Sequence, residues 1–165
     1  MQGRLRHAIA GAGAAAVLAG GTPALAGTTT NTLPVRVQVT VGCTLQTRPL
    51  MFDATTISNQ NIDSTTTITV RCTPNTDFTV EIDKGLYANG INRRMFSTEA
   101  NGYVTYDVYR DSPRNNVWGT GQTKNVTANS GTGLPLEITL FGRITKPGTI
   151  KAGDYKDTLL VTLNF

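Results

Sequence analysis

Apolar and polar residues alternate without a break between Leu33 and Val41. One side of an extended chain here would carry Leu33, Val35, Val37, Val39 and Val41, and the other side would carry Pro34, Arg36, Gln38 and Thr40. All the apolar residues but the first are β-branched, which favours a strand over a helix. The pattern therefore predicts a strand with one buried face.

Further stretches of the chain predict strands at 43–50, 64–72, 77–83, 93–98, 103–110, 117–118, 134–144 and 157–165. Their expected inward side chains are Thr66, Ile68, Val70, Cys72, Phe78, Val80, Ile82, Met95, Val104, Tyr106 and Val108. Segments 53–63 and 122–133 are polar or lack a clear period, so we expect loops there. Because turn signals separate short strands and helical spacing is absent, the sequence predicts an all-β fold, an antiparallel β-sandwich.

The first 26 residues have the pattern of a signal peptide. Arg4 and Arg6 precede an uncharged run of Ala, Gly, Val and Leu, and Ala24-Leu25-Ala26 has the small residues that a signal peptidase requires. A short buried helix is disfavoured because several glycines interrupt the run. We therefore expect export, with cleavage between Ala26 and Gly27.

Removal of this peptide changes the charge and the available chemistry. The formal net charge of +4 falls to +2, and no basic run with interleaved aromatics suggests nucleic-acid binding. The only histidine, His7, is also lost, which excludes His-dependent catalytic triads and metal sites. We expect no catalytic residue, cofactor, metal or small-molecule substrate.

Three weaker signals have ordinary structural interpretations. Asp77, Glu81 and Asp83 could bind a cation, but solvated charges on an outward face are favoured. Tyr103, Tyr109 and Trp118 could form a sugar-binding face, but packing is favoured. The sequon at Asn125 is attributed to chance.

Two cysteines, Cys43 and Cys72, remain after export. An even number in an exported protein favours one disulfide, because neither a zinc site nor a CxxC redox motif is present. Closing this loop would contribute about 3 to 4 kcal/mol to stability.

The final predicted strand, 157–165, reaches the last residue. Leu159, Val161, Leu163 and Phe165 share one face of it. Strong strands near both ends of a chain leave two sheet edges, and an open edge invites another chain to pair.

The ending 153–165, together with Tyr106–Asp111 and Gly42-Cys43-Thr44, resembles the spore coat protein U domain. Within that family it is similar to the major pilins of archaic, Csu-type chaperone-usher fibres, with 50–61 and 84–101 loosely matched. The resemblance implies an incomplete immunoglobulin-like sandwich that lacks its last strand. A periplasmic chaperone lends a strand, an outer-membrane usher assembles the fibre, and the next subunit then donates its N-terminal extension.

The resemblance also assigns residues and domains. It implies a signal peptide at 1–26, a donor-strand extension at 27–41 and a pilin-type domain at 42–165. Leu33, Val35, Val37, Val39 and Val41 match the donor strand, and Cys43 and Cys72 match the family disulfide. Leu159, Val161, Leu163 and Phe165 match the strand that borders the groove and pairs with the chaperone.

One residue departs from the expected donor strand. Pro34 lacks an N–H, so pairing is expected to begin at Val35. The expected protein is a pilus subunit that passes through the periplasm to the cell surface, with identical or related subunits as partners. The alternatives are a secreted coat protein without fibres, a carbohydrate-binding module or exported enzyme, and a complete sandwich in which 33–41 is an ordinary first strand.

Overall fold

The computed structural model describes residues 27–53 and 59–165, and residues 38–165 form one unit, distinct from the residues before it. Within this described part the strands are β1 (Cys43–Thr47), β2 (Ile62–Cys72), β3 (Asp77–Ile82), β4 (Arg93–Ser97), β5 (Gly102–Tyr109), β6 (Val126–Asn129), β7 (Leu136–Ile144) and β8 (Val161–Asn164). None of the described residues forms a helix long and apolar enough to cross a membrane.

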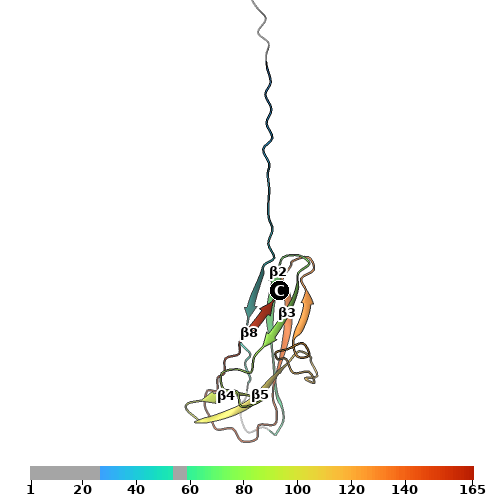
Figure 1. Cartoon of the computed structure of the whole chain (residues 1–165). Coiled ribbons are helices and arrows are strands. Elements are labelled where there is room, and N and C mark those ends of the chain that lie inside the picture. The colour runs from blue at the N-terminus through green and yellow to red at the C-terminus, as the bar shows by residue number, and fades with distance from the viewer. Residues whose placement is uncertain (1–26, 54–58) are drawn as a thin grey trace, which may run out of the picture. The chain divides into compact units, whose positions relative to one another are not determined.

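The strands form two sheets (Figure 1). The larger has the order β1-β2-β7-β5-β4, the smaller has the order β6-β3-β8, and every pair is antiparallel. The all-β sandwich predicted from the sequence is confirmed.

The core holds most of the inward side chains that the alternation predicts, whereas Thr66 and Met95 are half-buried. It includes Ile68, Val70, Cys72, Phe78, Val80, Ile82, Val104, Tyr106 and Val108, each at most 6% exposed. Trp118, fully buried, follows the short return at Val117 and donates its indole N–H to the carbonyl of Val80 at 2.9 Å. The alternative sugar-binding face that included Trp118 is therefore wrong.

The start of β1 and the end of β8 lie at the same end of the domain. Cys43 is opposite Cys72, the last residue of β2, and Asn164 is opposite Thr79, near the start of β3. A short turn joins β2 to β3, so these two pairs are close in space. Figure 1 shows the C-terminus at this end, beside the label of β2.

The strand predicted at 33–41 is not formed in this chain. Residues 27–42 contain no strand, and the apolar side chains from Leu33 to Val41 are 61% to 88% exposed. Which sheet this segment joins therefore stays a prediction. An alternating segment gains its stability from a pairing partner and a buried face.

Other strand boundaries also differ from those predicted from the sequence. β1 ends at Thr47 rather than at residue 50, because Pro49 cannot donate to a ladder and restricts the residue before it. β8 covers only Val161–Asn164 of the predicted 157–165. The loop expected at 122–133 contains β6, whose Val126 and Ala128 pack against the core. Part of the other expected loop, 54–58, lies outside the described residues.

Candidate functional site

The last strand, β8, has one paired edge and one open edge. Among the described strands it pairs only with β3, with Val80 opposite Leu163. Just before it, the N–H of Asp83 donates to the carbonyl of Leu160 at 3.0 Å, and the N–H of Leu160 donates to the Asp83 carboxylate at 2.9 Å. Backbone groups alternate between the two edges of a strand. Val161 and Leu163 therefore direct their N–H and carbonyl groups toward the open edge.

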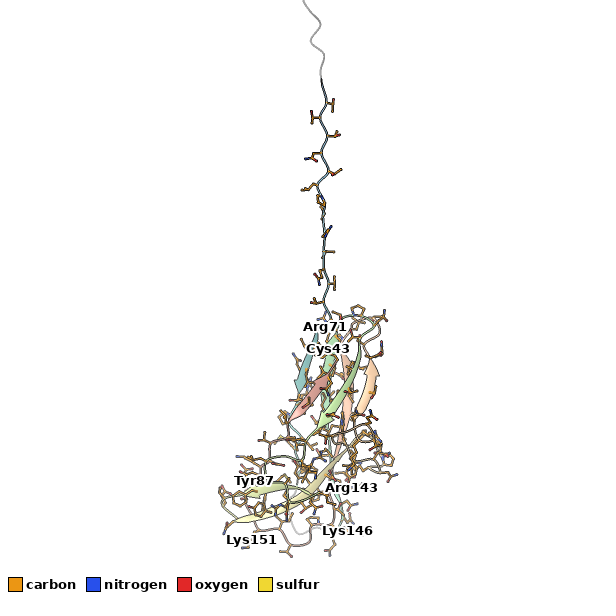
Figure 2. All side chains as sticks on the ribbon, viewed as in Figure 1. Cys43, Arg71, Tyr87, Arg143, Lys146 and Lys151 are labelled. Carbon is orange, nitrogen blue, oxygen red and sulfur yellow. A yellow bond between two sulfur atoms is a disulfide. The ribbon has the colours of Figure 1, made fainter. Side chains whose placement is uncertain are left out.

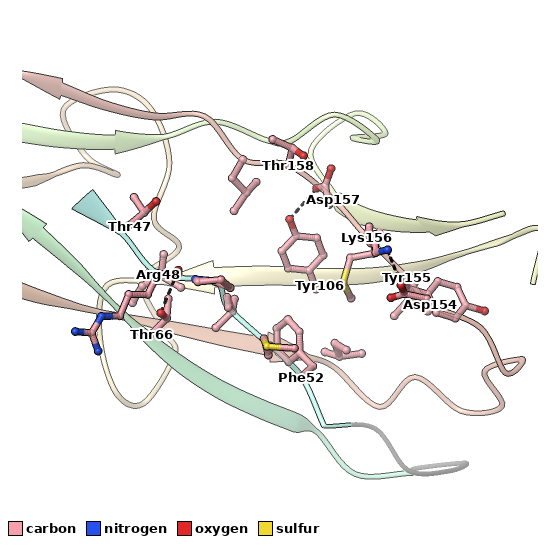
Figure 3. A pocket seen from close by; sticks show the side chains of 18 of the residues that line it. Thr47, Arg48, Phe52, Thr66, Tyr106, Asp154, Tyr155, Lys156, Asp157 and Thr158 are labelled. Atoms are coloured by element: carbon pink, nitrogen blue, oxygen red, sulfur yellow. Dashed lines mark hydrogen bonds and ion pairs between the residues drawn. The ribbon is translucent and has the colours of Figure 1, made fainter. Parts of the chain in front are cut away.

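A groove of about 980 Å³ opens between the two sheets beside this region. One wall is the segment Arg48–Phe52, and the other is the segment that leads into β8, from Tyr155 to Val161. The floor comes from the inner faces of β2, β5 and β7, with Ile68, Tyr106, Leu140 and Ile144. Figure 3 shows Tyr106 pointing between the two walls, with Phe52 on one side and Asp157 on the other. The interior of the groove is therefore largely apolar.

The four residues predicted on the last strand have different positions. Leu159 and Val161 line the groove, and Leu163 packs against the core on the same side. Leu160 points away and is 65% exposed, so the predicted alternation is present. Phe165 lies beyond β8 and is 61% exposed, so its role on the strand that borders the groove stays a prediction.

Asp157 fixes the chain where it enters the groove wall. Its carboxylate accepts hydrogen bonds from the N–H of Leu86 at 2.9 Å, the N–H of Tyr87 at 3.3 Å and the hydroxyl of Tyr106 at 2.7 Å. Burial, with the hydrogen bond to Asp157, raises the pKa of Tyr106 well above its usual range, so the phenol remains a donor. Gly85 has a φ of 84°, and a Cβ there would clash with the Asp157 carboxylate. Only glycine permits this close approach.

Arg93 is a buried charge that the sequence patterns did not reveal. It is 3% exposed, forms an ion pair with Asp107, and donates to the carbonyls of Ile82, Asp83 and Trp118. It therefore ties β4 and β5 to the end of β3. The only sign of it in the sequence was that the short strand predicted at 93–98 begins with a charged residue.

The predicted disulfide between Cys43 and Cys72 is present. It joins the first residue of β1 to the last residue of β2, which are directly opposite in the ladder. The N–H of Thr73 also donates to the carbonyl of Gly42 at 2.9 Å. Together these contacts fix the chain just after the alternating segment (Figure 2, Cys43).

The remaining candidate residues do not assemble into a second site. Asp77 accepts from Asn129, Glu81 from Gly121 and Asp83 from Gly85 and Leu160. No group of three or more metal-ligating residues occurs in the part of the chain that the structure describes. Gly27 is exposed, whereas Ala26 lies outside the described residues, so the cleavage site stays a prediction.

The two sheets and the open edge beside an apolar groove define an incomplete immunoglobulin-like β-sandwich. The family model for the Spore Coat Protein U domain matches residues 29–162, so the chain belongs to this family. The resemblance seen in the sequence is confirmed.

Individual proteins are also similar to this chain. Protein U of Myxococcus xanthus is 26% identical, with 98% of each chain covered. Another is a chain in the crystal structure of the CsuC-CsuE chaperone-tip adhesion subunit pre-assembly complex, from archaic chaperone-usher Csu pili of Acinetobacter baumannii. It is 25% identical with a TM-score of 0.57, over 77% of this chain and 40% of that chain. This chain thus spans less than half of that solved chain. The matches are to structural coat and pilus proteins and not to enzymes.

Proposed function

We propose that this chain is an exported structural subunit of a surface pilus, polymerised by insertion of Leu33–Val41 into the groove of another copy. The observation that carries the proposal is a pair of complementary features. A strictly alternating apolar segment is exposed, and an apolar groove lies beside an open strand edge. Strand addition to a sheet edge is an established mode of protein recognition.

The energetics make β8 essential to this proposal. Burying a Val or Leu side chain contributes about 1.5 to 3 kcal/mol. Ordering the backbone costs about 1 to 2 kcal/mol per residue, so burial of every second side chain is largely offset. Main-chain hydrogen bonds to the open edge of β8 are then needed for a stable complex.

The proposed assembly requires export and helper proteins. The pattern of residues 1–26 supports a signal peptide removed before Gly27, which exposes the extension at 27–41. The similar chain of the Csu pili was crystallised in a chaperone complex, which supports a periplasmic chaperone as a partner here. An outer-membrane usher and related pilin subunits complete the proposed set, and the assembled fibre lies on the cell surface.

The proposal is tested with the full exported chain and a matched pair of charge variants. Val37→Asp with Val39→Asp places two charges on the groove-facing side, whereas Gln38→Asp with Thr40→Asp places two on the other side. We expect denaturant-resistant multimers from wild type and from the second variant, and monomers from the first. Equal multimer formation by both variants would show that the segment does not insert.

A coat protein that does not form fibres is the second candidate. It is favoured by Protein U, which matches this chain over nearly its full length. In that case the folded wild-type protein would remain monomeric at high concentration and with a chaperone present. Stable multimers of wild type would exclude this candidate.

A further inference from the structure

We infer that the disulfide between Cys43 and Cys72 carries tension from the N-terminal extension directly into β2, so that β1 and the groove wall after it stay in place. This inference rests on the proposed function, because the extension comes under tension only when another copy holds it. It gives the disulfide a role in the fibre beyond the stability that any loop-closing bond contributes.

Tension on the extension enters the folded domain at Gly42, the residue before β1. Residues 27–42 form no strand, so no earlier ladder resists the pull. From Gly42 two routes are open. One follows the backbone into β1, and the other crosses the disulfide at Cys43 into the last residue of β2. The relative strength of these two routes decides which elements move.

The route through β1 is the weaker one. β1 is an edge strand, and its only neighbour among the described strands is β2, over the five pairs from Cys43–Cys72 to Thr47–Ile68. Each ladder hydrogen bond contributes little net free energy, because water can replace it. Without the disulfide, five pairs at a sheet edge would have to hold the whole pull.

The groove wall Arg48–Phe52 follows β1 directly and is held without a strand ladder. The hydroxyl of Thr66 donates to the carbonyl of its first residue at 3.2 Å. The side chains of Leu50 and Phe52 lie against Gly142 on β7, where a Cβ would clash with both. Movement of β1 would withdraw this wall and open the groove. Tension on the extension of one copy would then loosen its grip on the extension of another.

The route through the disulfide reaches the middle of the larger sheet. β2 pairs with β7 over nine residue positions, and β7 pairs in turn with β5. Cys72 itself lies in the core and is 5% exposed. Because the bond to Cys43 is covalent, the pull reaches β2 without passing through the β1 ladder. The groove wall is therefore kept out of the path of the tension.

This role differs from general stabilisation in where the weakness appears. In a fibre without the disulfide, β1 and the wall would yield before the rest of the domain. They would release residues 43–61, which span at most about 65 Å when extended, up to the start of β2. A general loss of stability would instead lower the force at which the whole domain unfolds, with no separate step.

The test stretches single fibres of three full chains in optical tweezers: wild type, Cys43→Ser with Cys72→Ser, and Val108→Ala. Val108 is a fully buried residue on β5 that does not line the groove, so its truncation lowers stability and keeps the disulfide. We expect lengthening steps of up to about 65 Å per subunit in the cysteine variant, before rupture. Wild type and Val108→Ala should show no such step.

A second route to disulfide-free fibres covers a cysteine variant that does not assemble. Wild-type fibres are assembled first and then treated with dithiothreitol, which reduces the disulfide to two thiols and is itself oxidised to a cyclic disulfide. Thiol labelling verifies the reduction. The same lengthening steps are expected from these fibres.

Each other outcome contradicts a specific claim. Disulfide-free fibres without the steps, or equal steps in Val108→Ala, would overturn this inference and leave strand donation intact. Fibres that fall apart on reduction without tension would also overturn it, since the groove wall would then need the bond at rest. Failure of wild type to form fibres would contradict the proposed function instead.

Discussion

At the scale of single residues, the contacts that the apolar alternation did not predict are those between polar side chains. Asp63 on β2 accepts two hydrogen bonds from Arg143 on β7, at 2.7 and 2.8 Å, and lies 3.3 Å from Arg114. These contacts link strands on the outer face of the larger sheet. The two hydrogen bonds from Arg143 join residues 80 positions apart, so no local pattern in the sequence predicted them.

The first prediction concerns acid stability. The hydrogen bond from Arg143 lowers the pKa of Asp63 from its usual value of 3.8. A lowered folded-state pKa stabilises the fold fully above about pH 4, and this contribution is lost as the pH falls through the folded-state pKa. Since Asp63 is 38% exposed, solvent screening limits the effect to about 1 kcal/mol or less.

Urea unfolding at pH 7 and pH 3 measures this contribution, with Asp63→Asn, its control and the wild-type residue all compared in the full chain that carries Val37→Asp and Val39→Asp. We expect the variant to lose less stability between the two pH values than wild type does. Glu137→Gln, at an exposed position on β7, is the control and should behave like wild type. An acid loss in Asp63→Asn equal to that of wild type would contradict the assignment.

At the scale of elements, the sequence revealed most strands and their buried faces, because one-sided burial leaves a period of two. The prediction ran past the end of β1 although Pro49 interrupts the ladder there, and it did not reveal the bounds of β8 or the existence of β6, since those depend on pairing partners. The residues that form the groove walls were harder still to predict from the sequence. Arg48–Phe52 has no strand, and Asp157 binds a loop some 70 residues away in sequence, so only the folded chain brings them together.

The second prediction concerns that wall. Asp157→Ala removes an acceptor shared by Leu86, Tyr87 and Tyr106, and leaves a largely buried phenol without its partner. We expect a loss of about 2 to 4 kcal/mol in unfolding free energy. The measurement is chemical denaturation of the full chain carrying the Val37→Asp and Val39→Asp substitutions.

Asp154→Ala is the matched control. Asp154 is 63% exposed and pairs with Lys156, so its removal should change stability by no more than about 0.5 kcal/mol. Equal losses of unfolding free energy in the two variants would contradict the conclusion that Asp157 fixes the groove wall.

At the scale of the whole molecule, an exposed alternating segment and an unfilled groove occur in the same chain. The alternation at 33–41 was recognisable in the sequence, but the sheet that this segment joins was not. An alternating pattern predicts a strand and does not identify the chain that supplies its neighbouring strand. In the structure, residues 27–42 form no strand. The proposed insertion into another copy would account for both features at once.

The most direct test is amide hydrogen exchange at β8, compared between wild-type multimers and the Val37→Asp, Val39→Asp monomer. The N–H of Thr162 faces β3 by the alternation of the strand and should be protected in both. The N–H groups of Val161 and Leu163 face the open edge and should be protected at least about 100-fold more in the multimer. Multimers in which these two amides exchange as fast as in the monomer would contradict strand donation.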